Sequence, residues 1–586
     1  MKEFSYVNFR YAMRFFDKTF LFLSGIFLLV CLFVQSATSL LAATIPDGGA
    51  ILRDQQRALP QQKGLPTREP EKSAEEKAGD DIRVDVKEFT FSGYDGVATE
   101  AELQALVFSA RGKVLTFSEL NNLADILTVH IKEKGWSQVR AYLPAQDITS
   151  GIVQITISQV KSDGTLSIKR DKSVRIRDCV LRCFVQSVVR VNQPINEHIL
   201  ERSLLLLTDL PGLSAKANFI PRAATGVSGL EVAVTEGPLF SGTLWGDNYG
   251  NRYTGLWRGN ATLSINDPLH YGDQMTLLLT EASGLAQGRV GYSFPLVRDV
   301  LRGNFAYTGM RYELGEDLAS LQYKGSSHSI DAGLNYPVLR TRNSNLTVGF
   351  YYGYRALVDT KAGADIRDKQ LNNINLSVSG GYYDRLFGGG SNSYSAGVTT
   401  GRLHESIADI GFTGAEGGYT HFNVALSRQQ RLGERLTLTF SGSAQSATGN
   451  LDSSEKFSLG GPNGVRAYPL SEASGDEGHL LNADLRYTLP LPSRWGFFQL
   501  NGFYDAGHST LNKVRYAGDV SSATNRNDYW LQGFGAGVNY SWLSRVSIRA
   551  IWAHVLGDNP GRSVAGNNSD GFNDKSRFWL QAMLSF

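Results

Sequence analysis

Two charged residues near the C-terminal end of the chain, Arg466 and Asp505, have the types and surroundings expected of a desolvated ion pair. Arg466 lies in a Gly-rich stretch, residues 451–477, that is too long for a hairpin turn, and connections of this length are usually functional or disordered. Asp505 shares strand parity with Gln499 and Asn501, so it should face water inside a strand array. An inward-folded loop would bring Arg466 to this carboxylate, where partial desolvation strengthens a bidentate pair. The alternative is a solvated surface arginine and an unrelated channel aspartate.

Residue patterns of catalysis and cofactor binding are missing from the sequence. There is no H-E-x-x-H, no G-x-S-x-G and no P-loop, so we predict no enzyme activity, no metal and no cofactor. GFGAG (533–537) lies inside an aromatic strand pattern with no helix after it, which favours glycines that relieve crowding in a wall. His404–Glu405 is an isolated pair. Cys179 and Cys183 are four apart, and both a disulfide and two separate thiols stay open.

Composition indicates many strands rather than a nucleic-acid-binding or disordered chain. The 586 residues carry a formal net charge of only +2, so no nucleic-acid partner is predicted. Glycine (62), tyrosine (25) and phenylalanine (30) are abundant, as expected for strands with turns and aromatic girdles. A disordered chain would lack the aromatic residues.

The region from Gly237 to Phe586 alternates apolar and polar side chains with a period of two. About sixteen strand candidates of roughly ten residues each fit into it, and an even number of antiparallel strands is typical of a closed transmembrane β-barrel. The last strand, Arg577–Phe586, ends in an aromatic residue, so we interpret Phe586 as a C-terminal outer-membrane assembly signal. A soluble β-sandwich would show the same alternation, but a barrel also removes every edge that lipid would penalise.

The N-terminus has the order of a secretory signal peptide. Basic residues precede an apolar run from Phe20 to Val34, and small residues follow it, so we assign residues 1–43 to a signal peptide cleaved between 39 and 45. An uncleaved inner-membrane anchor is the alternative, although the run is short for a span. Asp47 or Gly48 would cap a short polar helix, and residues 64–82 read as a flexible linker rich in Pro, Glu and Lys.

Between the linker and the barrel, two small α+β modules follow one another. In the first, 83–160, we expect strand Val84–Phe91, helices Thr99–Val107 and Ser118–Lys134, and strands Val139–Leu143 and Ile152–Val160. The second, 161–236, repeats this architecture without repeating the sequence. Its stretch 161–190 is basic, which could suit an acidic partner segment, but a solvated face is the simpler interpretation.

Four stretches together resemble the two-partner secretion transporters, the TpsB family of the BamA-like superfamily. They are IPDGGAILRDQQ (45–56), AYLPAQDITSGIVQITI (141–157), LLLLTDLPGL (204–213), and FSLGGPNGVRAYP (457–469) followed by FYDAG (503–507). The resemblance implies an N-terminal plug helix over 44–63, two POTRA domains, and a barrel whose inward loop is locked to the wall by Arg466 and Asp505. It also implies a loop motif at Val465, Ala467 and Tyr468, and a strand motif at Phe503, Tyr504 and Gly507. Ala467 departs from the family's common glycine, which disfavours a positive φ there.

The function implied by the resemblance is an outer-membrane pore for one large partner protein. Its POTRA domains, in the periplasm, would capture an unfolded TpsA-type exoprotein, such as a haemolysin or adhesin, and pass it to the cell surface. Outer-membrane lipid and the barrel-assembly machinery would be further partners. The alternatives are a barrel-assembly insertase, which usually has more POTRA domains, an outer-membrane hydrolase, and a passive porin.

Overall fold

The computed structural model describes residues 45–57 and 83–586, apart from 224–225, 298–299, 407–413, 517–518, 520–521 and 544. The predicted signal peptide (1–43), the predicted linker (64–82) and residues 44 and 58–63 of the predicted plug segment lie outside these residues. Within the described part of the chain, no helix is long and apolar enough to cross a membrane.

The first α+β domain is built on the three-stranded sheet β2-β5-β4 and a small sheet of β1 and β3. A capping box between Thr116 and Glu119 starts its longer helix, whose buried residues include Leu120 and Leu127. The single strand predicted over Val84–Phe91 is wrong, because the chain changes sheet after Asp85. Its elements are β1 (Arg83–Asp85), β2 (Glu88–Ser92), α3 (Glu100–Val107), the 3-10 turn η1 (Phe108–Ala110), β3 (Val114–Thr116), α4 (Phe117–Glu133), β4 (Val139–Tyr142) and β5 (Ile152–Gln159).

The second α+β domain repeats this plan with the sheet order β6-β8-β7. As in the first domain, the first and last strands pair in parallel and the hairpin strand pairs antiparallel. The side chain of Asn196 caps α6 by accepting from the amides of His198 and Ile199. Its elements are β6 (Lys161–Arg170), α5 (Asp178–Val185), η2 (Gln186–Val188), α6 (Glu197–Thr208), β7 (Leu213–Pro221) and β8 (Val227–Glu236).

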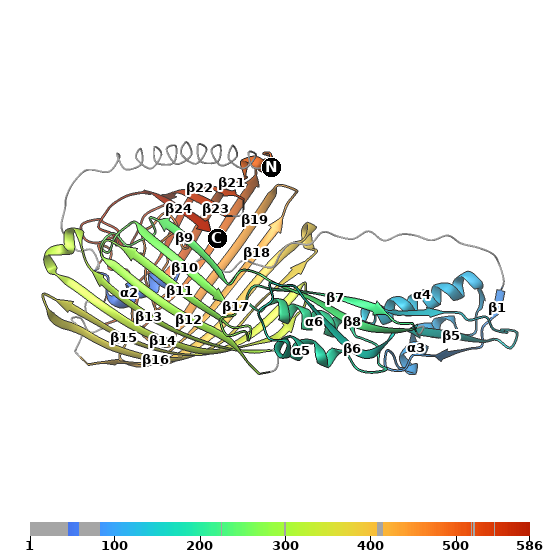
Figure 1. The fold of residues 1–586 in the computed structure, drawn as a ribbon. Helices are drawn as coiled ribbons and strands as arrows, with labels where there is room; N and C mark the ends of the chain where they lie inside the picture. Colours follow the sequence, from blue (N-terminus) through green and yellow to red (C-terminus); the bar gives the residue numbers. More distant parts are fainter. Residues whose placement is uncertain are drawn as a thin grey trace, which may run out of the picture. The chain divides into compact units, whose positions relative to one another are not determined.

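Sixteen antiparallel strands, β9 to β24, form a closed barrel, which confirms the predicted fold class (Figure 1). Each strand pairs with the next along the chain, and β24 closes on β9 through five residue pairs from Gln581–Asp247 to Ser585–Thr243. The strands are β9 (Phe240–Asp247), β10 (Arg258–Asn266), β11 (Gln274–Ala282), β12 (Leu285–Val297), β13 (Leu301–Glu313), β14 (Tyr323–Arg340), β15 (Ser344–Lys361), β16 (Ala364–Asp384), β17 (Gly390–Glu405), β18 (Gly417–Arg431), β19 (Leu436–Ala447), β20 (Glu477–Thr488), β21 (Phe497–Thr510), β22 (Asp528–Trp542), β23 (Val546–Val555) and β24 (Ser576–Ser585). Three 3-10 turns join strands: η3 (Glu316–Leu321), η4 (Leu386–Gly388) and η5 (Ser493–Trp495).

The two faces of the barrel wall differ as the period-two pattern predicts. Large apolar side chains such as Phe422, Phe534 and Trp552 are exposed on the outside, whereas polar side chains such as Asn260 and Thr280 are buried inside. Exposed apolar side chains on a closed wall suit a lipid environment.

The lumen contains two further segments: helix α2 (Gly48–Arg57) (Figure 1) and the connection between β19 and β20, residues 448–476, called here the inward loop. Seven of the ten residues of α2 are buried. Ile51 and Leu52 join an apolar cluster with Tyr312, Leu357 and Leu451. The inward loop supplies Leu459, Val465 and Tyr468 to a second cluster that also includes Phe503 and Leu531.

Candidate functional site in the barrel lumen

The structure brings Arg466 of the inward loop and Asp505 of β21 into direct contact. The guanidinium donates from Nε and Nη2 to the two carboxylate oxygens, at 2.8 and 2.6 Å, and the Arg466 amide donates to the same carboxylate at 3.0 Å. Both residues are buried, with relative exposures of 3% and 0%. Charge-assisted bidentate bonds of this kind are stronger than neutral hydrogen bonds.

A second carboxylate, Asp484 of β20, completes the coordination of the Arg466 guanidinium. Nη1 and Nη2 donate to its two oxygens at 2.9 and 3.1 Å. The ring of Phe503 lies 3.5 Å from the guanidinium carbon, a cation–π contact. The indole of Trp579, on the last strand, donates to the Arg466 carbonyl at 2.7 Å. Sequence parity places Asp484 on the lumen face, but nothing in the sequence links it or Trp579 to Arg466.

Glycines in the wall make the close approach of the inward loop possible. A Cβ at Gly533 would lie 2.6 Å from the Cβ of Ala467, and one at Gly507 would lie 2.5 Å from the side chain of Leu459. Ala467 is not among the residues with positive φ, so an L-residue with a methyl group is tolerated there. Val465, Ala467 and Tyr468 are all fully buried.

Two other residues of the predicted motifs, Tyr504 and Phe586, lie elsewhere in the barrel. Tyr504 points outward and donates to the side chain of Gln532 at 2.8 Å. Phe586 is exposed, but its backbone exchanges two hydrogen bonds with Gly242 of β9, at 2.9 and 3.0 Å. Phe586 therefore lies at the point where the barrel closes.

Nearer its N-terminal end, the inward loop is paired with strands further round the wall. Glu455 accepts from Arg355 of β15 at 2.5 Å and contacts the imidazole of His421 of β18 at 3.0 Å. Asp452 accepts from the ammonium group of Lys369, also at 3.0 Å. The loop therefore has ion pairs to β15, β16 and β18 as well as to β20 and β21.

Helix α2 packs on the inward loop and fills a further part of the lumen. Arg53 donates to the Ser453 carbonyl at 2.9 Å and to the Ser471 hydroxyl at 3.2 Å. The same hydroxyl donates to Asp54 at 2.6 Å. Towards the wall, Gln55 accepts from Arg258 of β10 at 2.8 Å. A polar cavity of about 440 Å³ stays open elsewhere in the lumen, with Arg289, Asp331, Asn375 and Glu455 among its lining residues.

Two arginines of the basic stretch 161–190 in the second α+β domain form ion pairs within the protein. Arg170 binds Asp178 at 2.7 Å, and Arg175 binds Glu236 at 2.5 Å. This favours the structural interpretation of the stretch over a binding site for an acidic partner. Cys179 and Cys183 are free, exposed thiols.

A closed, lipid-compatible barrel with an occluding helix, an inward loop and two α+β domains defines the class of outer-membrane transport pores. A family model described as "Haemolysin secretion/activation protein ShlB/FhaC/HecB" matches residues 226–540, more than half of the chain, and one described as "POTRA domain, ShlB-type" matches residues 84–159. The chain belongs to the ShlB/FhaC/HecB family, as its motifs predict.

Individual relatives agree. The Heme/hemopexin transporter protein HuxB of Haemophilus influenzae (strain 86-028NP) is 26% identical over 494 residues, covering 83% of this chain and 84% of that protein. Outer membrane transporter CdiB of Escherichia coli O6:K15:H31 (strain 536 / UPEC) is 22% identical over 408 residues, 67% of each chain. The solved structure of CdiB from Escherichia coli has the same fold, with a TM-score of 0.72 and 18% identity over 94% of this chain and 100% of that one.

Family and fold together establish the function that the motifs predict. The chain is a TpsB outer-membrane transporter of two-partner secretion, which acts with a secreted TpsA-type exoprotein, and its POTRA domains lie in the periplasm.

Proposed function

We propose that the exoprotein is captured unfolded by the two POTRA domains and passes through the lumen after helix α2 has left it. The observation that carries this proposal is the occlusion of the lumen by α2 and the inward loop, which contact each other through Arg53, Ser453 and Ser471. Because both segments fill part of the lumen, we expect secretion to require a second arrangement of these segments.

Capture is proposed to use strand addition to the POTRA sheets. Strand β4 lies at one edge of its sheet and β7 at the edge of the other, and each pairs with one strand among the described residues. An extended segment can add to such an edge through main-chain hydrogen bonds. Deleting residues 83–236, the two proposed domains 83–160 and 161–236, should abolish release of the exoprotein into the medium. Unchanged secretion would refute capture by these domains.

The contact of Arg466 with Asp505 and Asp484 is proposed to lock the inward loop to the wall. It would have a structural role, since it holds the loop across the lumen in the resting state. Because no P-loop is present, the work of transport would come from folding of the exoprotein outside the cell, which makes its return unfavourable.

Biogenesis is proposed to depend on the closing strand. The exposed aromatic ring of Phe586, next to the seam of β24 and β9, would be the signal read by the barrel-assembly machinery, and the apolar outer face would contact outer-membrane lipid. Removing Phe586 should lower the amount of heat-modifiable protein in the membrane, whereas Phe497→Ala, a matched exposed phenylalanine on β21, should not.

The cargo is proposed to be related to that of HuxB, because HuxB matches more of this chain, at higher identity, than CdiB does. A haem- or hemopexin-binding exoprotein is therefore the first to test. Co-expression with a candidate exoprotein, followed by its assay in the medium, decides between cargoes, and secretion of an unrelated exoprotein alone would refute this choice.

A further inference from the structure

The turn between β10 and β11, residues 267–273, is one seat of the second POTRA domain on the barrel. Another is the end of β14, where Arg340 pairs with Asp209 of the domain. The amide of Arg177 donates to the His270 carbonyl at 3.0 Å, and its guanidinium lies 4.1 Å from the centre of the Tyr271 ring. Gly272 packs closely against Leu210, since a Cβ at Gly272 would lie 3.0 Å from that side chain. The conformation of this turn therefore contributes to the docking of the domain.

Two carboxyl groups are buried inside this turn. Asp267 and Asp273 have relative exposures of 1% and 0%. Asp273 accepts from the Tyr292 hydroxyl at 2.7 Å and from the amides of Leu269 and Tyr271 at 3.3 to 3.4 Å, so its negative charge is well solvated by donors.

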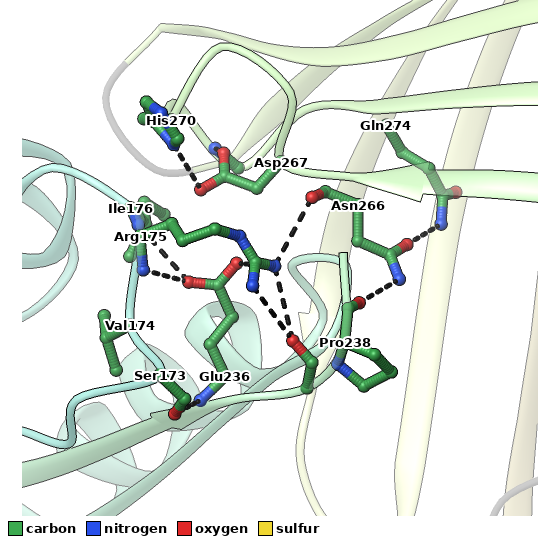
Figure 2. Close-up of polar contacts among 12 residues, drawn as sticks. Ser173, Val174, Arg175, Ile176, Glu236, Pro238, Asn266, Asp267, His270 and Gln274 are labelled. Atoms are coloured by element: carbon green, nitrogen blue, oxygen red, sulfur yellow. Dashed lines mark hydrogen bonds and ion pairs between the residues drawn. The ribbon is translucent and has the colours of Figure 1, made fainter. Parts of the chain in front are cut away.

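Asp267 is different, because half of its carboxyl group has no donor. Its Oδ1 accepts from the Gly272 amide at 2.6 Å, but its Oδ2 is buried without a hydrogen-bond partner. The His270 imidazole, whose Nδ1 is 3.9 Å from this oxygen, forms an ion pair with it only when the imidazole is protonated (Figure 2). A buried, unsatisfied carboxylate oxygen is costly, whereas a protonated Oδ2 would donate to the neighbouring carboxylate of Asp273.

Apart from the imidazole of His270, the charged groups around Asp267 have other partners. Arg175 is taken up by Glu236, which also accepts from the Arg175 amide at 2.5 Å (Figure 2). Arg302 donates to the Gly272 carbonyl and to Ser293. Burial, followed by the negative charge of Glu236 and the contact with Asp273, raises the pKa of Asp267. The titratable and charged groups around Asp267 are Arg175, Arg177, Asp209, Glu236, His270, Asp273, Tyr292 and Arg302.

We propose that Asp267 and Asp273 share one proton, and that loss of this proton loosens the seat of the second POTRA domain at this turn. Ionised Asp267 would face a buried anion, so the turn must open, and the contacts of His270, Tyr271 and Gly272 open with it. The docked state binds more protons than the loosened state. Docking is therefore strongest in acid and weakens as the pH rises through the docked-state pKa of Asp267. This inference does not rest on the proposed path of the exoprotein.

The test measures the distance between the domain and the barrel by electron–electron double resonance on the full-length protein in detergent. Spin labels are placed at Lys172→Cys in the POTRA domain and at Phe387→Cys, an exposed barrel turn, after the native cysteines are replaced by serine. We expect a narrow distance distribution at about pH 5 that is lost by about pH 9, well above the ordinary aspartate pKa.

Asp267→Asn replaces the shared proton by an amide donor, so its distribution should stay narrow at both pH values. Asp273→Asn should abolish the response as well, which keeps the test decisive if one variant fails to fold. Asp163→Asn, a change at a partly buried carboxyl group in the same domain that pairs with Arg222, should respond like the wild type. A wild-type distribution that is the same at both pH values, or an Asp267→Asn protein that still responds, would overturn the proposal.

Discussion

The inward loop and helix α2 occupy the same lumen, but different interactions hold them there. The cation of Arg466 is buried in the loop, while its two counter-ions, Asp484 and Asp505, belong to the wall. In α2, by contrast, Arg53 pairs with Asp54 of the same helix, and its bonds to the loop go to serine oxygens.

The consequences of removing each segment differ accordingly. If α2 leaves, Arg258 of the wall keeps its 2.8 Å bond to Asp247, and Asp359 keeps its bond to Tyr312. If the loop leaves, two buried wall carboxylates lose their cation, which is strongly unfavourable. Helix α2 is therefore built as the removable part of the obstruction and the loop as the durable part.

The largest expected effect comes from removing the contact between Arg466 of the inward loop and Asp505 of the wall. Asp505→Ala leaves Arg466 and its amide short of a buried acceptor, and we expect a loss of about 3–5 kcal/mol in barrel stability together with impaired secretion. The temperature at which the folded gel band disappears measures the first, and exoprotein in the medium measures the second.

Arg466→Ala should have a similar defect, and the double variant should be little worse than either single one, because both remove one shared contact. Additive defects would show that the two residues act independently. Asp331→Ala, a half-exposed lumen carboxylate, is the control that should remain close to wild type.

A change in packing gives the next effect. Gly533→Ala would place a methyl group 2.6 Å from the Cβ of Ala467, and overpacking of this kind costs about 1–3 kcal/mol. The second-site change Ala467→Gly should restore the stability of the gel band. Gly502→Ala, where a Cβ meets nothing within 4 Å, should have no effect, and failure of the rescue would contradict the proposed loop–wall contact.

A weaker perturbation tests the removable helix. Gln55→Ala removes the bond to Arg258, so it should make the lumenal position of α2 less favourable by about 1 kcal/mol. This lowers the ratio of inserted to released helix about fivefold. Ion conductance in planar bilayers should rise, while barrel stability stays unchanged. Gln56→Ala, at an exposed position of the same helix, should leave conductance as it is; equal conductance in both variants would contradict the role of this contact.

The smallest expected effect concerns a surface ion pair of Glu102 outside the membrane. Its contribution to stability can be compared with that of the buried ion pairs. Lys134, with His130, lowers the pKa of Glu102 in the first POTRA domain. A lowered folded pKa means that the stabilisation is present above the ordinary glutamate pKa and is lost as the pH falls through the folded value. We expect this ion pair to contribute no more than roughly 0.5 kcal/mol to the stability of the domain. The contribution is measured in the full chain as a shift of the domain's urea midpoint with pH. Glu102→Gln should remove this shift, and Glu133→Gln should not.

Sequence periodicity is enough to predict the barrel and the lumen side of Asp505, because a period of two determines which face each side chain takes. The same parity places Asp484 in the lumen. It does not reveal the partners of Glu455, since Arg355 and His421 lie on strands whose position across the lumen depends on closure of the whole sheet. The break after Asp85 is missed because the change of sheet depends on hydrogen bonds to Gly151 and Lys113, which are distant in sequence.

The hydrogen bond from Trp579 to the Arg466 carbonyl ties the inward loop to β24, the strand that closes the barrel on β9. Until β24 is in position, that buried carbonyl lacks its donor. The inward loop of an incomplete barrel therefore lacks one of its hydrogen bonds to the wall. The inward loop can therefore complete its contacts with the wall only after β24 has closed the barrel.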